Sequence, residues 1–180
     1  MNKSEIQKVL HQNYTSFVDS VKNMSEGEAM KSAEGKWSPA RLLDHLIKSV
    51  RPVKLAFSLP TFILSLFFGR ANRPSRNYAE LIDRYHSKLA SGGKASRPFI
   101  PDQINELSPL YRKMERSIHT LNRLIDNFSE ADLDRLILPH PLLGKLTLRE
   151  MLYFTAYHAQ HHGNQIDPHN KYAPAKDHEI

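Results

Sequence analysis

The sequence predicts an all-α protein built around four long helices, and three observations lead to this prediction. Apolar residues recur every three or four positions in four separate stretches, which is the spacing of a helix that buries one face. No stretch shows the regular alternation of a half-buried strand with any strength. A long connection, roughly residues 57 to 102, separates the second stretch from the third, and a crossover of that length allows neighbouring helices in a bundle to run parallel.

The first two helices have recognisable boundaries. The first is expected over residues 4 to 24, where helical spacing continues until a polar segment containing Gly27 interrupts it. The second begins at Ser38 and Pro39, because serine is a favoured N-cap and proline a favoured first-turn residue. Pro52 is expected to kink or end this helix, since proline lacks a backbone N–H and clashes with the preceding turn.

The third and fourth helices carry the clearest patterns. Residues 103 to 128 place apolar side chains at alternating spacings of three and four, as in the seam of a helical bundle. Ser129 is suited to cap a short turn after this helix. Residues 139 to 146 are expected to form a loop. The last helix begins at Thr147, which forms a capping-box pattern with Glu150 three residues later.

Length and composition indicate a globular protein. The 180 residues suit a single domain, residues 1 to 180 with a core of about 5 to 170. The chain has no cysteine, which excludes disulfides, thiolate ligands and a cysteine nucleophile and is compatible with a reducing, cytoplasmic location. No secretory signal or membrane span is expected. Most of the net charge of +6 falls between residues 70 and 97, as in a solvated connection, so a nucleic-acid partner is not expected.

The long connection contains an apolar run over residues 55 to 68 that Pro60 interrupts. The run is too short to span a bilayer. It can cover one end of the bundle, form a homodimer interface or, with neighbouring arginines, contact a membrane surface. We predict a homodimer, because the run exposes more apolar surface than a short connection needs. The residues concerned are Phe62, Ile63, Leu66, Phe67 and Phe68.

Two histidines near the end of the last helix point to metal chemistry. His158 and His162 are four residues apart, a separation of about 400° of rotation and about 6 Å of rise, so both lie on one face. His45 lies in the second helix, and if the two helices pack together, three imidazoles can converge and leave coordination positions open, as catalytic metal sites do. Ala159 stands where a zincin has its glutamate, so peptide hydrolysis of that kind is not expected.

Other polar residues are weaker candidates. His161 is rotated by about 100° from His162 and is expected to point away from the metal. Asp44 precedes His45 and suits an outer or surface carboxylate better than a base. His169 lies two turns beyond His162 and could line the same face. Five further histidines are scattered and are expected to face solvent or to make local hydrogen bonds: His11, His86, His119, His140 and His178.

The order and separation of several short motifs resemble the DinB/YfiT-like superfamily of metalloenzymes. The motifs are Trp37-Ser38-Pro39, Asp44-His45-Leu46, Thr147-Leu148-Arg149-Glu150 and His158-Ala159-Gln160-His161-His162-Gly163-Asn164-Gln165-Ile166. The resemblance implies a four-helix bundle with an up-down-down-up course, in which His45, His158 and His162 hold a divalent metal. The usual Gly-Gln pair of the family appears here one residue longer, as residues 163 to 165. Relatives include bacillithiol S-transferases and mycothiol-dependent maleylpyruvate isomerases.

The function expected from these features is a metal-dependent enzyme acting on a small molecule. All-nitrogen ligation suits one divalent ion of Zn, Ni, Fe or Mn. The resemblance favours a thiol-dependent S-transferase or isomerase whose partner is a low-molecular-weight thiol. Two alternatives stay open: a metal-dependent hydrolase, and a non-catalytic metal-binding bundle that binds a ligand or serves a stress response. No acid, base or substrate-orienting residue can be assigned from the sequence.

Overall fold

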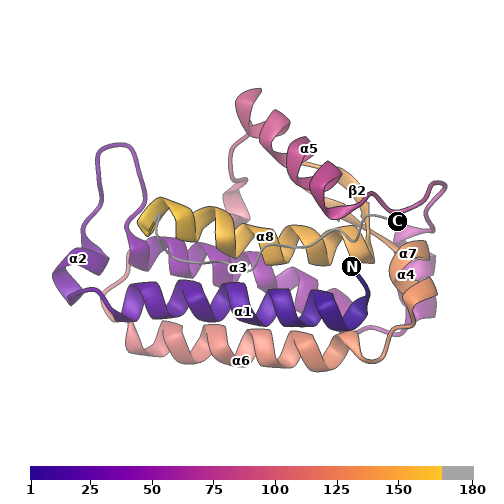
Figure 1. Ribbon diagram of the computed structural model, residues 1–180, viewed down its shortest axis with the longest axis horizontal. Coiled ribbons are helices and arrows are strands. Elements are labelled where there is room, and N and C mark those ends of the chain that lie inside the picture. The colour runs from indigo at the N-terminus through magenta and orange to yellow at the C-terminus, as the bar shows by residue number, and fades with distance from the viewer. Residues whose placement is uncertain (168–180) are drawn as a thin grey trace.

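The computed structural model describes residues 1–167, which form a mainly helical structure (Figure 1). Its elements follow in the order α1 (Lys3–Lys22), α2 (Glu26–Met30), α3 (Pro39–Phe57), α4 (Thr61–Phe68), α5 (Tyr78–Ala90), the 3₁₀ turn η1 (Arg97–Phe99), α6 (Ser108–Ile125), α7 (Glu130–Arg135), β1 (Ile137–His140), β2 (Gly144–Thr147) and α8 (Leu148–Ile166).

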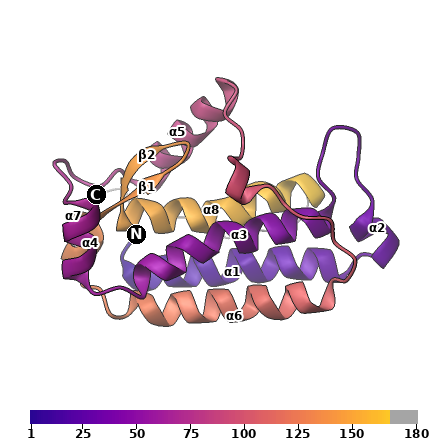
Figure 2. The same ribbon diagram turned by 180° about the vertical axis from the view of Figure 1, so that it is seen from behind.

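Four long helices, α1, α3, α6 and α8, form the bundle. Helix α1 packs against α6 and α8, and α3 packs against the same two helices from the other side. Figures 1 and 2 show that α3 and α6 run in one direction while α1 and α8 run in the other. The course is therefore up-down-down-up, and the segment between α3 and α6 is the long crossover that permits this arrangement. The predicted all-α bundle is confirmed.

The core of the bundle follows the apolar spacing of the sequence. On α6, the buried residues Met114, Ile118, Leu121 and Ile125 are separated by three or four positions, so they lie on one face of the helix. The predicted caps also form, since the Ser38 hydroxyl accepts a hydrogen bond from the backbone N–H of Arg41. These local signals explain why the first, third and fourth predicted helices agree with the observed ones to within about five residues.

Pro52 does not end the second long helix, so that part of the prediction is wrong. Helix α3 continues through Pro52 to Phe57. Proline costs one backbone hydrogen bond, but the turns around it bury Val50, Val53 and Ala56. Tertiary burial of this face outweighs the local cost, because packing rather than propensity supplies most helix stability.

A second difference is a β-hairpin where the sequence predicts a loop and no strand. Strands β1 and β2 pair antiparallel, with Ile137 opposite Thr147 and His140 opposite Gly144. An isolated hairpin is marginal in water, so its stability depends on packing: Leu138 and Leu146 are buried and both strands contact α8. The long crossover likewise contains two helices, α4 and α5, which the sequence analysis leaves unassigned.

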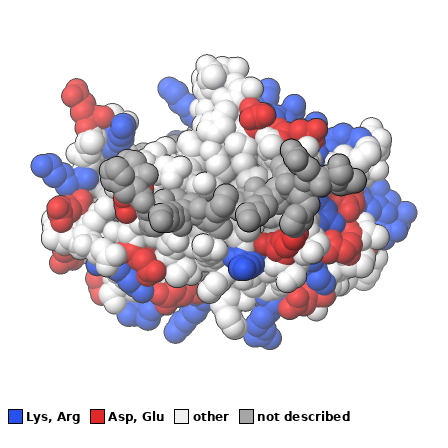
Figure 3. All heavy atoms as spheres, viewed as in Figure 1, with Lys and Arg blue, Asp and Glu red and all other residues white. Residues whose placement is uncertain are grey.

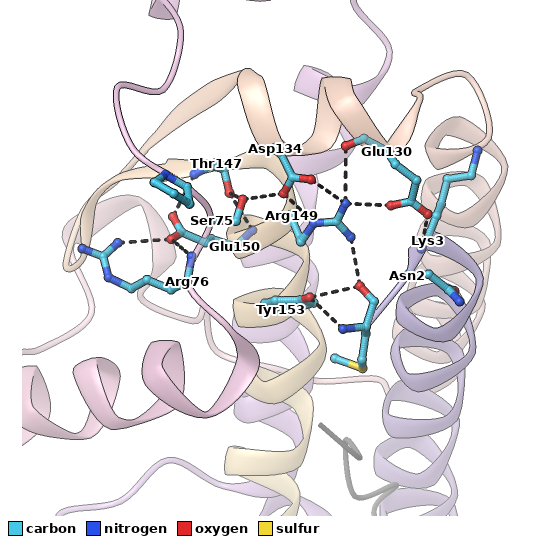
Figure 4. A network of polar contacts seen from close by, with 12 residues as sticks. Asn2, Lys3, Ser75, Arg76, Glu130, Asp134, Thr147, Arg149, Glu150 and Tyr153 are labelled. Atoms are coloured by element: carbon cyan, nitrogen blue, oxygen red, sulfur yellow. Dashed lines mark hydrogen bonds and ion pairs between the residues drawn. The ribbon is translucent and has the colours of Figure 1, made fainter. Parts of the chain in front are cut away.

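The start of α8 is fixed by a buried carboxylate. Glu150 is fully buried and accepts hydrogen bonds from the Arg73 guanidinium at 2.6 and 2.8 Å and from the Arg76 backbone N–H at 2.8 Å. It also accepts one from the backbone N–H of Thr147, which completes the predicted capping box. Glu150 therefore joins the first turn of α8 to the crossover as well as capping the helix (Figure 4).

The neighbouring Arg149 fastens α8 to two other parts of the chain. Its guanidinium donates to Asp134 and Glu130 of α7 and to the backbone carbonyl of Met1, as Figure 4 shows. Burial alone would lower the pKa of Arg149, but the hydrogen bonds to the two carboxylates raise it above its ordinary value. The side chain consequently stays charged and holds the N-terminal segment, α7 and α8 together.

The surface combines mixed charge with one apolar patch. On the face shown in Figure 3, acidic and basic side chains are interspersed. Helix α4 buries Leu64 but leaves Phe62 at 69%, Leu66 at 77% and Phe67 at 74% exposed. No single helix in residues 1–167 has the length and apolar character needed to cross a membrane, although α3 and α4 satisfy that test as a pair bent by 109°.

Candidate metal centre

The three predicted ligands converge between α3 and α8. His45 comes from α3, His158 and His162 come from α8, and all three side chains are buried. The Nε2 atom of His158 lies 3.1 Å from Nε2 of His45 and 3.0 Å from Nε2 of His162. Among the described residues, these are the only histidines or acidic groups whose ligand atoms gather closely enough for one metal ion.

Hydrogen bonds fix the tautomers of two of these imidazoles. The Nδ1–H of His45 donates to the backbone carbonyl of Phe99 at 2.6 Å, and the Nδ1–H of His162 donates to Oε1 of Gln165 at 3.1 Å. Each neutral ring therefore presents an unprotonated Nε2 to the centre. This is the usual arrangement of metal-ligating histidines, in which the outer nitrogen donates to a carbonyl and orients the ring.

The donor set fits a divalent ion. Two nitrogens bound at about 2.1 Å to one ion, with an angle of about 90–110° between them, are about 3.0–3.4 Å apart, and the observed separations of 3.0 and 3.1 Å fall in this range. His158 can donate one Nε2 proton at most, so at least one lone pair of its two neighbours lacks a hydrogen. A cation would satisfy all three lone pairs together.

Burial keeps the three rings neutral. Desolvation lowers the pKa of His45, and it lowers that of His162 to about 3. Desolvation and the neighbouring imidazole of His162 lower the pKa of His158 well below its ordinary value. At neutral pH each ring is therefore neutral, with one nitrogen unprotonated, which is the form that binds metal.

A short segment after η1 holds His45 in position. The carboxylate of Asp44 accepts a hydrogen bond from the backbone N–H of Asp102 at 2.9 Å, and Lys48 lies 3.1 Å from Asp44 and 3.0 Å from Asp102. These contacts fasten the segment along α3 and place the Phe99 carbonyl on His45. Asp44 thus has the outer, non-basic role that the sequence suggests.

His161 lies outside the set of three, as its helical position predicts. Its Nε2 accepts a hydrogen bond from the side-chain amide of Gln165 at 3.2 Å, and its ring packs against Tyr85 at 5.3 Å. Gln165 therefore bridges His161 and His162, since the opposite end of its amide accepts from His162. The extra residue before Gln165 does not prevent it from supporting a candidate ligand.

The histidines open onto a cavity of about 800 Å³, within the range that binds small molecules. Several polar side chains that the sequence analysis did not single out as site residues also line it, among them Tyr14, Tyr85 and His140. The buried hydroxyl of Tyr14 has no hydrogen-bond partner among the described residues. The lining is therefore not purely apolar.

His140 presents a defined donor to this cavity. Its Nδ1 accepts hydrogen bonds from the backbone N–H groups of Leu142 and Leu143 at 3.2 and 3.1 Å. Burial lowers the pKa of His140 to about 4, so at neutral pH its single proton is on Nε2. The ring packs on Phe154, which in turn packs on His158. The scattered position of His140 in the sequence gives no sign of this placement.

The remaining described histidines lie apart from the centre, whereas Trp37 contacts it. His86 is exposed and hydrogen-bonds to the Tyr157 hydroxyl at 2.7 Å, and His11 and His119 are also exposed. The Trp37 ring packs on His45 with a centroid distance of 5.0 Å. His169 and His178 lie outside the described residues.

Comparison with known proteins identifies the family. The family model for the DinB superfamily matches residues 10–166, and the chain therefore belongs to the DinB superfamily. Comparison with curated proteins finds no match. Among solved structures, the chain is similar to YfiT from Bacillus subtilis, described as a probable metal-dependent hydrolase with an unusual four-helix bundle topology. The TM-score is 0.62 at 17% sequence identity, with 92% of this chain and 84% of YfiT covered.

Proposed function

We propose that this protein is a metal-dependent enzyme acting on a small molecule, with His45, His158 and His162 as the ligands of one divalent ion. The observation that carries the proposal is the convergence of three neutral imidazoles at the wall of a cavity. A divalent ion held there, such as Zn, Ni, Fe or Mn, would act as a Lewis acid and lower the pKa of an approaching thiol or water.

The acid–base groups around the cavity favour thiol-dependent transfer or isomerisation. Lys94 is the one charged residue among the described residues that line the cavity, and no aspartate or glutamate is among them. A water nucleophile generally needs a positioned base, whereas a thiol, with an ordinary pKa of about 8.5, ionises far more readily. Low-molecular-weight thiols stay reduced in the cytosol, so we place the reaction in the cytoplasm.

His140 supplies a substrate-orienting group of the kind that an enzyme requires. It lines the cavity, and its Nδ1 is occupied by two backbone N–H groups, so its Nε2–H is left to donate. In the proposed reaction this N–H binds an acceptor atom of the substrate and holds it beside the three histidines. Such a preplaced donor favours the enzyme over a bundle that only stores or senses metal.

Hydrolysis is the second candidate reaction. The fold is similar to that of YfiT, whose description as a probable metal-dependent hydrolase favours this chemistry. In that case the nucleophile is water, and the absence of a carboxylate from the described cavity lining leaves proton removal to bulk solvent. The two reactions make opposite predictions for an added thiol.

Cobalt substitution separates the two reactions. We expect a low-molecular-weight thiol added to the cobalt-loaded protein to produce a sulfur-to-metal charge-transfer band, because an anionic sulfur is attracted to an ion held by neutral ligands. The His140→Leu variant should retain the band while losing turnover, since His140 is not a proposed ligand. Absence of the band at saturating thiol, together with metal-dependent hydrolysis of simple esters, would favour the hydrolase.

The exposed face of α4 supports a proposed homodimer. Phe62, Leu66 and Phe67 are each more than two-thirds exposed, and apolar patches of this kind usually mark contacts. Light scattering across a dilution series should give twice the mass of one chain, and Leu66→Lys should shift the mass toward the monomer. A constant monomeric mass at tens of micromolar would contradict the dimer.

A further inference from the structure

The walls of the cavity are largely hydrocarbon. Seen in Figure 2, α5, η1 and the β-hairpin stand on the side of the bundle formed by α3 and α8, and residues of these elements surround about 800 Å³. That volume suits a compound of roughly drug size. The apolar lining includes Val53 and Ala56 of α3, Leu89 of α5, Leu138 of β1, Leu142 of the hairpin turn and Phe154 of α8.

The cavity offers few partners to a charged substrate. Lys94, which is exposed, is the one charged residue among the described lining residues. A nucleotide or another polyanion would lack the cluster of cations that normally binds it, and a cationic substrate would find no carboxylate. Burial of an unpaired charge is costly, so the lining favours a neutral compound.

His140 defines the polar part of such a compound. Its Nδ1 accepts hydrogen bonds from two backbone N–H groups, so the proton of the neutral ring is on Nε2 and is available to donate. This donor calls for an acceptor oxygen on the bound molecule. The Tyr14 hydroxyl also lacks a partner among the described residues, but it is buried, so a bound molecule does not reach it in this structure.

We infer that the substrate is a neutral, largely apolar carbonyl compound whose hydrocarbon part fills the cavity between α3, α5 and the β-hairpin. Its oxygen accepts a hydrogen bond from His140 beside the three histidines. This inference rests on the proposed function, because the cavity is a substrate site only if the histidines hold a reactive metal. Hydrocarbon binding itself does not require the metal, and an experiment can therefore test the two separately.

Trp37 provides the measurement. It is the one tryptophan in the chain and lines the cavity, so its fluorescence reports occupancy with and without metal. The probes are linear alkanohydroxamic acids, from acetohydroxamic acid to the decyl homologue, titrated against zinc-loaded and metal-free protein. We expect affinity to rise about fourfold per added methylene until the cavity is full. This dependence on chain length should be the same with and without zinc, and zinc should raise the affinity of every homologue by the same factor.

Variants of the protein test where the alkyl chain of the probe binds. Ala56→Phe should reduce the affinity of the long homologues at least about tenfold, because filling the cavity displaces several methylenes worth about fourfold each. Leu142→Asp places a charge on the cavity wall from a hairpin turn and should act likewise if Ala56→Phe fails to fold. Leu66→Asp lies on the exposed face of α4, outside the cavity lining. It is expected to weaken the proposed dimer, but it should leave the chain-length series unchanged. The affinity for acetohydroxamic acid should be unchanged in all three variants.

The outcomes separate the two proposals. Zinc-dependent binding of acetohydroxamic acid with no chain-length dependence would overturn the apolar substrate and leave the metal site standing. A slope abolished by Leu66→Asp instead of by the cavity variants would also overturn it, because the probes would then bind α4. If affinity still rises with chain length but zinc does not raise it, the result would support the apolar cavity and contradict the metal proposal.

Discussion

His158→Ala is expected to abolish stoichiometric binding of a divalent metal. His158 is the central member of the set, since its Nε2 lies 3.1 Å from that of His45 and 3.0 Å from that of His162. Loss of an outer hydrogen-bond partner typically reduces metal affinity about 10–100-fold, and loss of a direct ligand should exceed that range. Metal content after dialysis, with calorimetric titration of zinc, measures the effect. His45→Ala and His162→Ala should behave similarly.

The matched control is His161→Ala, three residues further along the same helix. His161 packs on Tyr85 and accepts from Gln165, so its removal should preserve most of the bound metal. Gln165→Leu should fall between the two, with a loss of about 10–100-fold, because it removes the acceptor that orients His162. If His161→Ala loses metal and His162→Ala does not, the assignment of the faces of α8 is wrong.

The second large effect concerns stability. Glu150→Gln should lower the free energy of unfolding by about 3–5 kcal/mol, the usual cost of breaking a buried ion pair by changing one partner. The reason is that Arg73 and Arg76 both pair with this fully buried carboxylate. Urea unfolding followed by circular dichroism measures the change.

The control for this substitution is Glu115→Gln. Glu115 pairs with Lys22 at 2.8 Å, but the two side chains are 55% and 42% exposed, so the expected change is within about 1 kcal/mol. Equal effects of the two substitutions would contradict the proposed role of Glu150 as the anchor of α8.

The Glu150 carboxylate should also affect how the free energy of unfolding changes at acidic pH. Burial alone would raise the pKa of Glu150, but hydrogen bonds from Arg73, Arg76 and Thr147 lower it below its ordinary value. Its contribution is therefore complete above the unfolded pKa of about 4.3 and is lost as the pH falls through the lower, folded pKa. The difference between wild type and Glu150→Gln should accordingly shrink below about pH 4.

The long helices and the pairing of His158 with His162 could be predicted because their signals are local, whereas His45 joined them through the resemblance to the DinB/YfiT-like superfamily. Helical spacing and caps such as Ser38 need only a few neighbouring residues, and one turn of helix suffices to align His158 with His162. The hairpin could not be predicted in this way. Its strands have four residues each, and Ile137 and Leu138 are both buried, so the apolar–polar alternation that marks a strand is missing.

The other residues of the site could not be predicted from the sequence for a related reason. His140 reaches the cavity only because the hairpin folds onto α8, and Phe99 reaches His45 only because the crossover returns to α3. Tyr14 reads as an ordinary member of the first helix until the bundle closes around it. Contacts between residues so far apart in the sequence produce no periodic pattern of apolar residues from which they could be predicted.

The up-down-down-up course also determines when this protein can fold during synthesis. Helix α1 packs mainly on α6 and α8, which emerge much later in the chain. The apolar face of α1 therefore stays exposed until α6 and α8 have been synthesised. Non-local pairing of this kind slows folding and prolongs the exposure of apolar surface. Two of the three proposed ligands belong to α8, the last described helix. A metal ion would therefore bind only after the bundle has formed. It would stabilise folded chains in which α3 and α8 are already packed together.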